Sequence, residues 1–170
     1  MSESGAPANT LRPSSFRQVM SRFATGVVVL TVGGEHVHGM TANSFTSVSL
    51  RPPLVLCCVA HSAAMHGALV AERRFGVSVL AADQQHLARY FADRTRPRGS
   101  AQFEPTDWWP GPRTGAPLLS NSLAWLECEL TDAHRAGDHS VFVGAVLSTV
   151  RGADRDGLLF LDGAFRRVER

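Results

Sequence analysis

The chain has 170 residues, a length typical of one domain, and its 17 basic and 15 acidic residues give a formal net charge of +2. So small an excess of positive charge argues against a protein that binds nucleic acid or an anionic membrane. Its three cysteines have neither the spacing of a metal site nor the number of a disulfide framework. No apolar run approaches the roughly 18 residues of a membrane helix, so we expect a cytoplasmic protein without a metal.

The first elements are predicted as a tail, a helix and a hairpin. Residues 1–13 are small, polar and proline-containing, which is typical of a disordered tail, and residues 14–170 then form the domain. Apolar residues at helical spacing follow a serine cap at Ser14 or Ser15. The apolar strand 27–32 comes next, and Gly33-Gly34 indicates a hairpin turn into a strand around Val37.

A polar segment, residues 39–49, lies between two apolar strands, 27–32 and 54–60. It carries small hydroxyl and amide side chains where a buried strand would carry valine and isoleucine. Thr41, Asn43 and Ser44 supply donors and acceptors, and Ala42 would let a flat ring approach the backbone. An edge strand with solvated hydroxyls is the alternative explanation, and the composition alone does not decide between them.

The end of strand 54–60 leads into a predicted helix, residues 62–72, with Ser62 as its cap. Free amides at a helix start, together with a serine hydroxyl, can bind a phosphate without any lysine. An ordinary serine cap without a ligand is the alternative.

The second half of the chain is predicted to be mostly strands. After strand 75–80, Asp83 is expected to cap a helix, and the proline-rich residues 93–117 are expected to form a long loop. Residues 123–130 alternate as a half-buried antiparallel strand does, and Asp162-Gly163 indicates a further hairpin. The whole pattern favours a mainly β protein with short helices, folded as a closed or nearly closed antiparallel barrel.

Some of the remaining polar residues are weaker candidates for a site. Gly137-Asp138-His139 forms a predicted turn at a strand mouth, where a histidine can donate to an anionic or amide group. His36 and His38 share a predicted strand face but lack a third metal ligand. Arg94, Arg96 and Arg98 are expected to be solvated, although one of them could steer a phosphate.

Taken in order, five motifs resemble the flavin reductase family, the small reductase components of two-component flavin monooxygenases. They are residues 23–29 (FATGVVV), 39–49 (GMTANSFTSVS), 52–55 (PPLV), 75–80 (FGVSVL) and Gly137-Asp138-His139. The resemblance covers about residues 15–168. It implies an FMN-binding split β-barrel with Greek-key-like connections, usually a homodimer, that passes hydride from NADH or NADPH to FMN or FAD.

The resemblance also implies roles for individual residues. Flavin would be lined by Thr41, Ala42, Asn43, Ser44, Val59, Ser62 and Ala63, and the nicotinamide dinucleotide by Gly137, Asp138 and His139. No protein acid or base is expected, because the cofactors carry the chemistry. Where many members have Ser-x-x-Thr this chain has Ser62-Ala63-Ala64-Met65, which predicts a looser hold on the flavin phosphate.

Two other functions stay open at this stage. One is a flavin-binding protein that carries the cofactor without turnover, and the other is a flavoenzyme of the same fold with its own small substrate.

Overall fold

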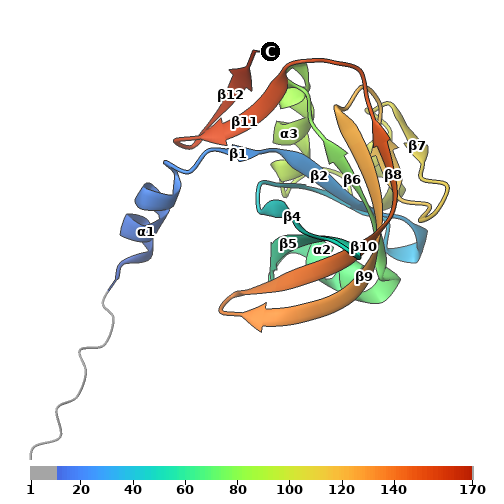
Figure 1. Ribbon diagram of the computed structural model, residues 1–170, viewed down its shortest axis with the longest axis horizontal. Helices are drawn as coiled ribbons and strands as arrows, with labels where there is room; N and C mark the ends of the chain where they lie inside the picture. Colours follow the sequence, from blue (N-terminus) through green and yellow to red (C-terminus); the bar gives the residue numbers. More distant parts are fainter. Residues whose placement is uncertain (1–10, 170) are drawn as a thin grey trace, which may run out of the picture.

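The computed structural model describes residues 11–169, and its main element is one antiparallel sheet of seven strands curled into a barrel (Figure 1). The strand order is β3-β2-β6-β9-β10-β5-β4. The strands are β2 (Val28–Val32), β3 (His38–Ala42), β4 (Phe45–Leu50), β5 (Pro53–Ala60), β6 (Arg74–Val79), β9 (Ala124–Ala136) and β10 (His139–Arg151). The predicted mainly β, antiparallel barrel is therefore confirmed.

The barrel is split between β3 and β4, which are neighbours in sequence but lie at opposite ends of the strand order. Only Asn43 and Ser44 connect them. Ser44 belongs to the β4 side, because its carbonyl accepts from the Cys58 amide at 3.1 Å and its hydroxyl donates to the Cys58 carbonyl at 2.8 Å. The polar segment of the sequence thus marks the place where the sheet does not close.

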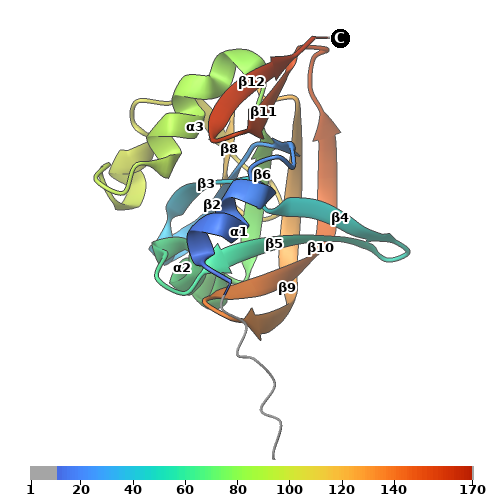
Figure 2. The same cartoon turned by 90° about the vertical axis from the view of Figure 1, so that its left-hand side faces the viewer.

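Two small sheets and the helices pack around the barrel. One sheet joins β1 (Thr25–Gly26), β11 (Gly157–Leu161) and β12 (Ala164–Val168), and the other joins β7 (Trp108–Pro110) and β8 (Pro117–Leu119). The helices are α1 (Pro13–Met20), α2 (Ala64–Glu72) and α3 (Gln85–Ala92), with 3-10 turns η1 (Gly34–His36), η2 (Ala82–Gln84) and η3 (Gly99–Phe103). In both ribbon views α3 lies beside β11 and β12 (Figures 1 and 2), and Figure 1 shows α1 standing apart from the barrel. Among residues 11–169 there is no helix with the length and apolar composition needed to cross a membrane.

Apolar side chains form two cores, one on each face of β2. The barrel core fills the interior and includes Val28, Leu30, Val55, Cys57, Val59, Phe75, Val77, Cys128 and Phe142. The outer core lies between the sheet and the α3 side and includes Val27, Val29, Leu80, Ala88, Phe91, Phe103, Leu119 and Leu158. Every residue of β2 is buried, because β2 is covered on both faces.

Several local predictions are wrong. The first helix begins at Pro13, since proline suits a first helical position, and not after a serine cap. The residue before α2 is Ala63, so Ser62 is not a cap, and Asp83 lies inside η2 while Gln84 precedes α3. The β2–β3 connection is longer than a two-residue turn because η1 lies in it, and it places His36 outside the strand that holds His38.

The expected long loop, residues 93–117, contains η3, β7 and the first residue of β8. Its prolines did not prevent β7 and β8 from pairing with each other, because Pro110 faces Pro117 at the end of that two-stranded sheet. Of the expected tail, residues 1–10 lie outside the described residues.

Candidate functional site

The main candidate site is a pocket of about 330 Å³ beside the split of the barrel. We call it the arginine pocket, because three arginines line it and no Asp or Glu does. Its lining comes from β3, from the β5–α2 loop and from the end of α3 with the loop that follows. The lining residues are His38, Met40, Thr41, Ser62, Ala63, Ala64, Phe91, Ala92, Arg94, Arg96, Pro97 and Arg98.

Arg96 is fixed in this pocket by backbone carbonyls. Its guanidinium donates to the Gly39 carbonyl and, at 2.5 Å, to the Asp93 carbonyl, and it lies over the Phe91 ring at 5.7 Å from the centroid. The Asp93 carboxylate accepts from the amide and hydroxyl of Thr95. Within residues 11–169, Arg96 has no ion pair with a carboxylate. Burial lowers its pKa, but a guanidinium stays charged at pH 7.

His38 shows how positive the pocket is. Its Nε2 lies 3.3 Å from an Arg96 nitrogen, and because a guanidinium cannot accept, the imidazole nitrogen must be the acceptor. Burial, followed by the charges of Arg96 and Arg98, lowers the pKa of His38 to about 4. His38 is thus neutral at pH 7, and the arginines carry the charge.

The start of α2 forms the opposite wall of the arginine pocket. Ala63 precedes the nine-residue helix and offers no side-chain acceptor to its first amides, and Ser62 is exposed at the rim. The positive end of a helix dipole favours an anion. The arginines and this helix end together form a cradle suited to a phosphate group.

The predicted residues of the polar segment lie at the split. Thr41 faces the pocket and its hydroxyl donates to the Ala88 carbonyl at 2.7 Å, and Ala42 is buried. Ser44 is engaged with Cys58. Asn43 is exposed, and its side chain has no hydrogen bond within residues 11–169, so its amide is available to a ligand.

The other two predicted flavin contacts differ in position. Ala63 lines the arginine pocket, whereas the Val59 side chain is 1% exposed and points into the barrel core. Any contact of Val59 with a ligand in the pocket would therefore have to come from its backbone.

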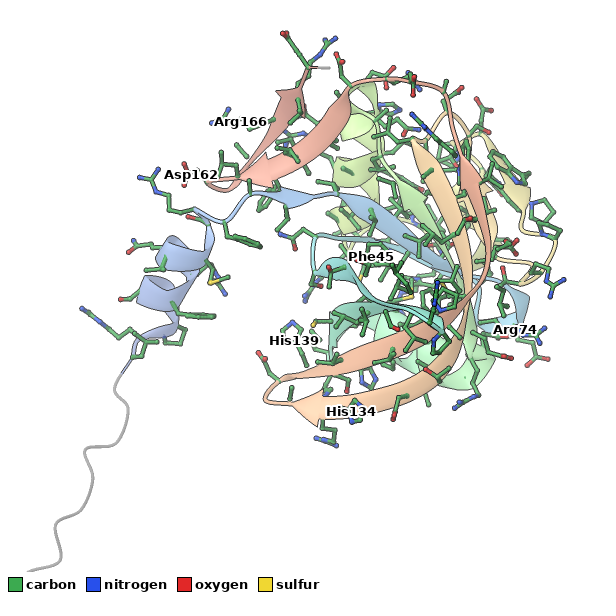
Figure 3. All side chains as sticks on the ribbon, viewed as in Figure 1. Phe45, Arg74, His134, His139, Asp162 and Arg166 are labelled. Atoms are coloured by element: carbon green, nitrogen blue, oxygen red, sulfur yellow. The ribbon has the colours of Figure 1, made fainter. Side chains whose placement is uncertain are left out.

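The predicted Gly137-Asp138-His139 turn is not part of the arginine pocket's lining, but it contacts the β5–α2 loop that contributes to that lining. The Asp138 carbonyl accepts from the His61 amide at 3.0 Å, which ties the turn to the β5–α2 loop. His139 Nδ1 lies 2.6 Å from the Asp138 carboxylate, and this hydrogen bond, with the His139 charge, lowers the pKa of Asp138. Figure 3 shows His139 and His134 on the hairpin of β9 and β10. The structure thus brings the β5–α2 loop and the turn together from segments far apart in sequence.

Sequence reasoning missed the place of the arginines. Arg94 and Arg98 are exposed, as expected, and Arg96 is half-buried. The sequence indicated only that one of the three could steer a phosphate, whereas all three line the pocket. Their alternate spacing in a proline-rich segment was the available signal, but nothing local indicated that the segment folds back over Gly39. Within the described chain, no group of three His, Cys, Asp or Glu side chains could hold a metal ion.

Comparison with known proteins gives one consistent result. The flavin reductase like domain family matches residues 20–169. An NADH-dependent FAD reductase of Streptomyces globisporus is 49% identical over 164 residues, covering 95% of this chain and 90% of that protein. The reductase subunit HsaB of a flavin-dependent monooxygenase from Rhodococcus jostii is 35% identical over 163 residues, covering 95% of this chain and 81% of HsaB.

Among solved structures, BorF is the flavin reductase component of a bacterial two-component tryptophan halogenase. It superposes with a TM-score of 0.91 at 55% identity, covering 94% of this chain and 99% of BorF.

Proposed function

The chain belongs to the flavin reductase family, and we propose that it transfers hydride from NADH to FMN or FAD and supplies the reduced flavin to a partner monooxygenase. The observation that carries the proposal is the arginine pocket beside the split of the barrel. The same proposal has three further parts: NADPH can replace NADH as the donor, the protein is cytoplasmic, and residues 14–170 form one domain.

The residues present fit a flavin nucleotide. A phosphate needs positive charge and amide donors, and the arginines with the start of α2 supply both. The flat ring needs hydrogen-bonding groups along an accessible edge, and Asn43 presents a free amide at the split. The arginines also offer a hold on the phosphate where the sequence lacks the threonine common in the family.

When bound, the nicotinamide and the flavin supply direct hydride transfer, in which NADH loses two electrons and one proton to the flavin. The chain holds the two ligands in contact and needs no acid or base of its own. Asn43 and the arginine pocket position the flavin, and the Asp138-His139 pair seats the dinucleotide.

The test is oxidation of NADH by the purified protein with FMN or FAD added under anaerobic conditions. We expect one NADH consumed per flavin, with no turnover when flavin is omitted. Flavin binding without NADH oxidation would instead identify a carrier protein, and flavin-dependent turnover of a separate small substrate would identify another flavoenzyme.

Matched arginine variants test the pocket itself. Arg98→Gln removes a charge that lines the pocket, and Arg166→Gln removes an exposed charge on β12. We expect weaker flavin binding, by roughly tenfold for one charge-assisted contact, only in Arg98→Gln. Equal flavin affinity in the two variants would place the phosphate elsewhere.

A homodimer is the second part of the proposal, and two apolar surfaces support it. On the outer sheet face, a half-buried row runs over β5 and β10 and comprises Leu54, Leu56, Cys58, Val141, Val143 and Ala145. On α1 and the residues after it, Phe16, Val19, Met20 and Phe23 are between 46% and 70% exposed. A second copy of the chain would cover both surfaces, whose apolar side chains lie next to one another and are not scattered singly.

A further inference from the structure

A second pocket, of about 340 Å³, lies on the other side of the β5–α2 loop. We call it the histidine pocket. Its lining comes from that loop, from α2 and from the projecting hairpin of β9 and β10, and comprises His61, His66, Val70, Ala133, Arg135, Ser140 and Phe142. Arg135 pairs with Ser140 across the hairpin, so the two side chains lie on the same face. The proposed flavin reduction uses none of these side chains.

Ser140 fixes both histidines. Its side chain is 4% exposed, and its hydroxyl lies 3.1 Å from His61 Nε2 and 2.9 Å from His66 Nε2. The rings meet edge to face with centroids 5.1 Å apart, and His66 also packs against Phe142. With both Nε2 atoms committed to Ser140, each ring has its Nδ1 atom unbonded within the described residues.

The proton count of this cluster favours an anion. A hydroxyl has one proton and two lone pairs, so at least one imidazole must donate its Nε2 proton to Ser140. When both imidazoles are protonated, both can donate to the Ser140 oxygen, and both Nδ1 protons remain for a ligand. An anion beside the rings stabilises that doubly protonated form.

The charges around the pocket point in the same direction. Burial, followed by the charges of His61 and Arg135, lowers the pKa of His66. No Asp or Glu lines the pocket. The carboxylate that interacts with His61, that of Asp138, is already held by His139 at 2.6 Å. Among the described residues that line the pocket, Arg135 therefore carries a positive charge with no carboxylate to neutralise it, and it lies beside two imidazoles that can donate to an anion.

We propose that the histidine pocket binds a phosphate group through His61, His66 and Arg135, at a site separate from the arginine pocket. The phosphate can be a free ion or part of a nucleotide, because both present the same oxygens. The site is independent of the proposed reductase reaction, since Ser62 to Ala64 line one pocket whereas His61 and His66 line the other.

The test is a titration of the full-length protein, without flavin or NADH, followed by the imidazole NMR signals of its seven histidines. The probes are inorganic phosphate and, separately, 5′-AMP. We expect saturable shifts of the His61 and His66 signals, a higher pKa for His66 because a bound anion opposes the lowering by Arg135, and no change at exposed His134. His38 reports phosphate in the arginine pocket and serves as the internal comparison.

Variants decide whether the pocket binds the probe. Arg135→Gln should weaken phosphate binding at His61 and His66 by about tenfold, whereas the Arg166→Gln control should not change it. Tighter binding of 5′-AMP than of phosphate would identify a nucleotide as the source, and equal binding would identify the free ion. Shifts confined to His38, shifts that do not saturate, or unchanged affinity in Arg135→Gln would overturn the proposal, whatever the result of the NADH oxidation assay.

Discussion

The outer face of the barrel sheet is covered on its β2 side and only partly covered on its β5–β10 side. On β2, Val29 is fully buried under the outer core, and Thr31 is buried beneath β8, donating to the Pro117 carbonyl at 2.7 Å. On β5 and β10, the corresponding face carries Leu56 and Val143, which are only half-buried in the single chain. The half that contains β2 is covered by other segments of the same chain. The half that contains β5 and β10 keeps its outward apolar side chains half-buried in the single chain.

The boundary between the two halves lies on β9, at Glu127. Glu127 as a whole is 2% exposed. Its carboxylate accepts from the amides of Arg113 and Thr114 at 2.8 Å each, from the Thr114 hydroxyl at 2.9 Å and from the Ser148 hydroxyl at 2.8 Å. These bonds pin the loop before β8 onto the sheet. Beyond this residue, residues 11–169 leave the row on β5 and β10 only half-buried, and the proposed dimer interface lies there.

The largest effect is expected from a charge on the uncovered half. In Val143→Asp a carboxylate would be buried against the second copy, at a cost of about 3 kcal/mol or roughly a hundredfold in the dimer dissociation constant. Light scattering during gel filtration should show the mass fall from twice the 18.3 kDa of one chain to that of one chain. A wild-type protein that is already monomeric, or a variant that stays dimeric, would contradict the assigned interface.

Alanine substitutions of two valines, Val29 on β2 and Val143 on β10, compare how much each half of the sheet contributes to the free energy of unfolding. Val29→Ala removes two methyl groups from the outer core and should lower the free energy of unfolding by about 2 kcal/mol. Val143→Ala removes the same groups from the half-buried row and should cost less than about 1 kcal/mol when measured at a protein concentration low enough for the chain to be monomeric. Urea unfolding of both variants gives the two values, and equal losses would mean that β10 is covered as fully as β2.

The strands and the polar segment could be predicted from the sequence, but the difference between the two halves could not. Alternation at residues 123–130 predicts a half-buried strand, and β9 confirms it. The same pattern places Glu127 on a polar face, because nothing local shows that Thr114 folds over it. Arg96 is similar: its contact with the Gly39 carbonyl spans 57 residues, and no local pattern encodes so distant a partner.

Glu127→Gln tests the boundary. Burial alone would raise the pKa of Glu127, but the hydrogen bonds from Ser148, Thr114 and Arg113 outweigh it and lower the pKa. Loss of these charge-assisted bonds should cost about 1–3 kcal/mol. Glu129→Gln, which breaks only an exposed pair with Arg74, should cost about 0–1 kcal/mol and is the control.

The pH dependence of Glu127 has a definite sign. A carboxylate whose folded pKa lies below its unfolded value stabilises the protein fully above the ordinary value of 4.5, and the stabilisation is lost as the pH falls through the folded pKa. Unfolding measured from neutral pH down into this range should show a smaller acid loss in Glu127→Gln than in the wild type. If the free energy of unfolding fell equally with pH in the wild type and in Glu127→Gln, the Glu127 carboxylate would not be what holds the loop before β8 on the sheet.

Asn43→Leu acts at the split, where the end strands of the two halves, β3 and β4, do not pair. The change removes the free amide and adds bulk beside the proposed ring position, so the flavin dissociation constant should rise roughly tenfold, as for one or two lost hydrogen bonds. Fluorescence titration with FMN and FAD measures it. The free energy of unfolding should stay within about 0.5 kcal/mol, because Asn43 is exposed, and an unchanged flavin affinity would count against this residue.

His139→Ala should give the smallest effect. In contrast to Asn43→Leu, it should weaken the binding of NADH and leave the binding of flavin almost unchanged. His139 lies on the outer face of β10, next to the uncovered row, and the β5–α2 loop is bonded to the neighbouring Asp138. Loss of one hydrogen bond to the dinucleotide should raise the Michaelis constant for NADH by roughly three- to tenfold. The flavin dissociation constant should stay within about twofold, because the Asn43 amide and the arginine pocket remain intact. Equal increases in the flavin dissociation constant and in the Michaelis constant for NADH would mean that His139 contacts both ligands. Both would then bind on the β5–β10 side of the sheet.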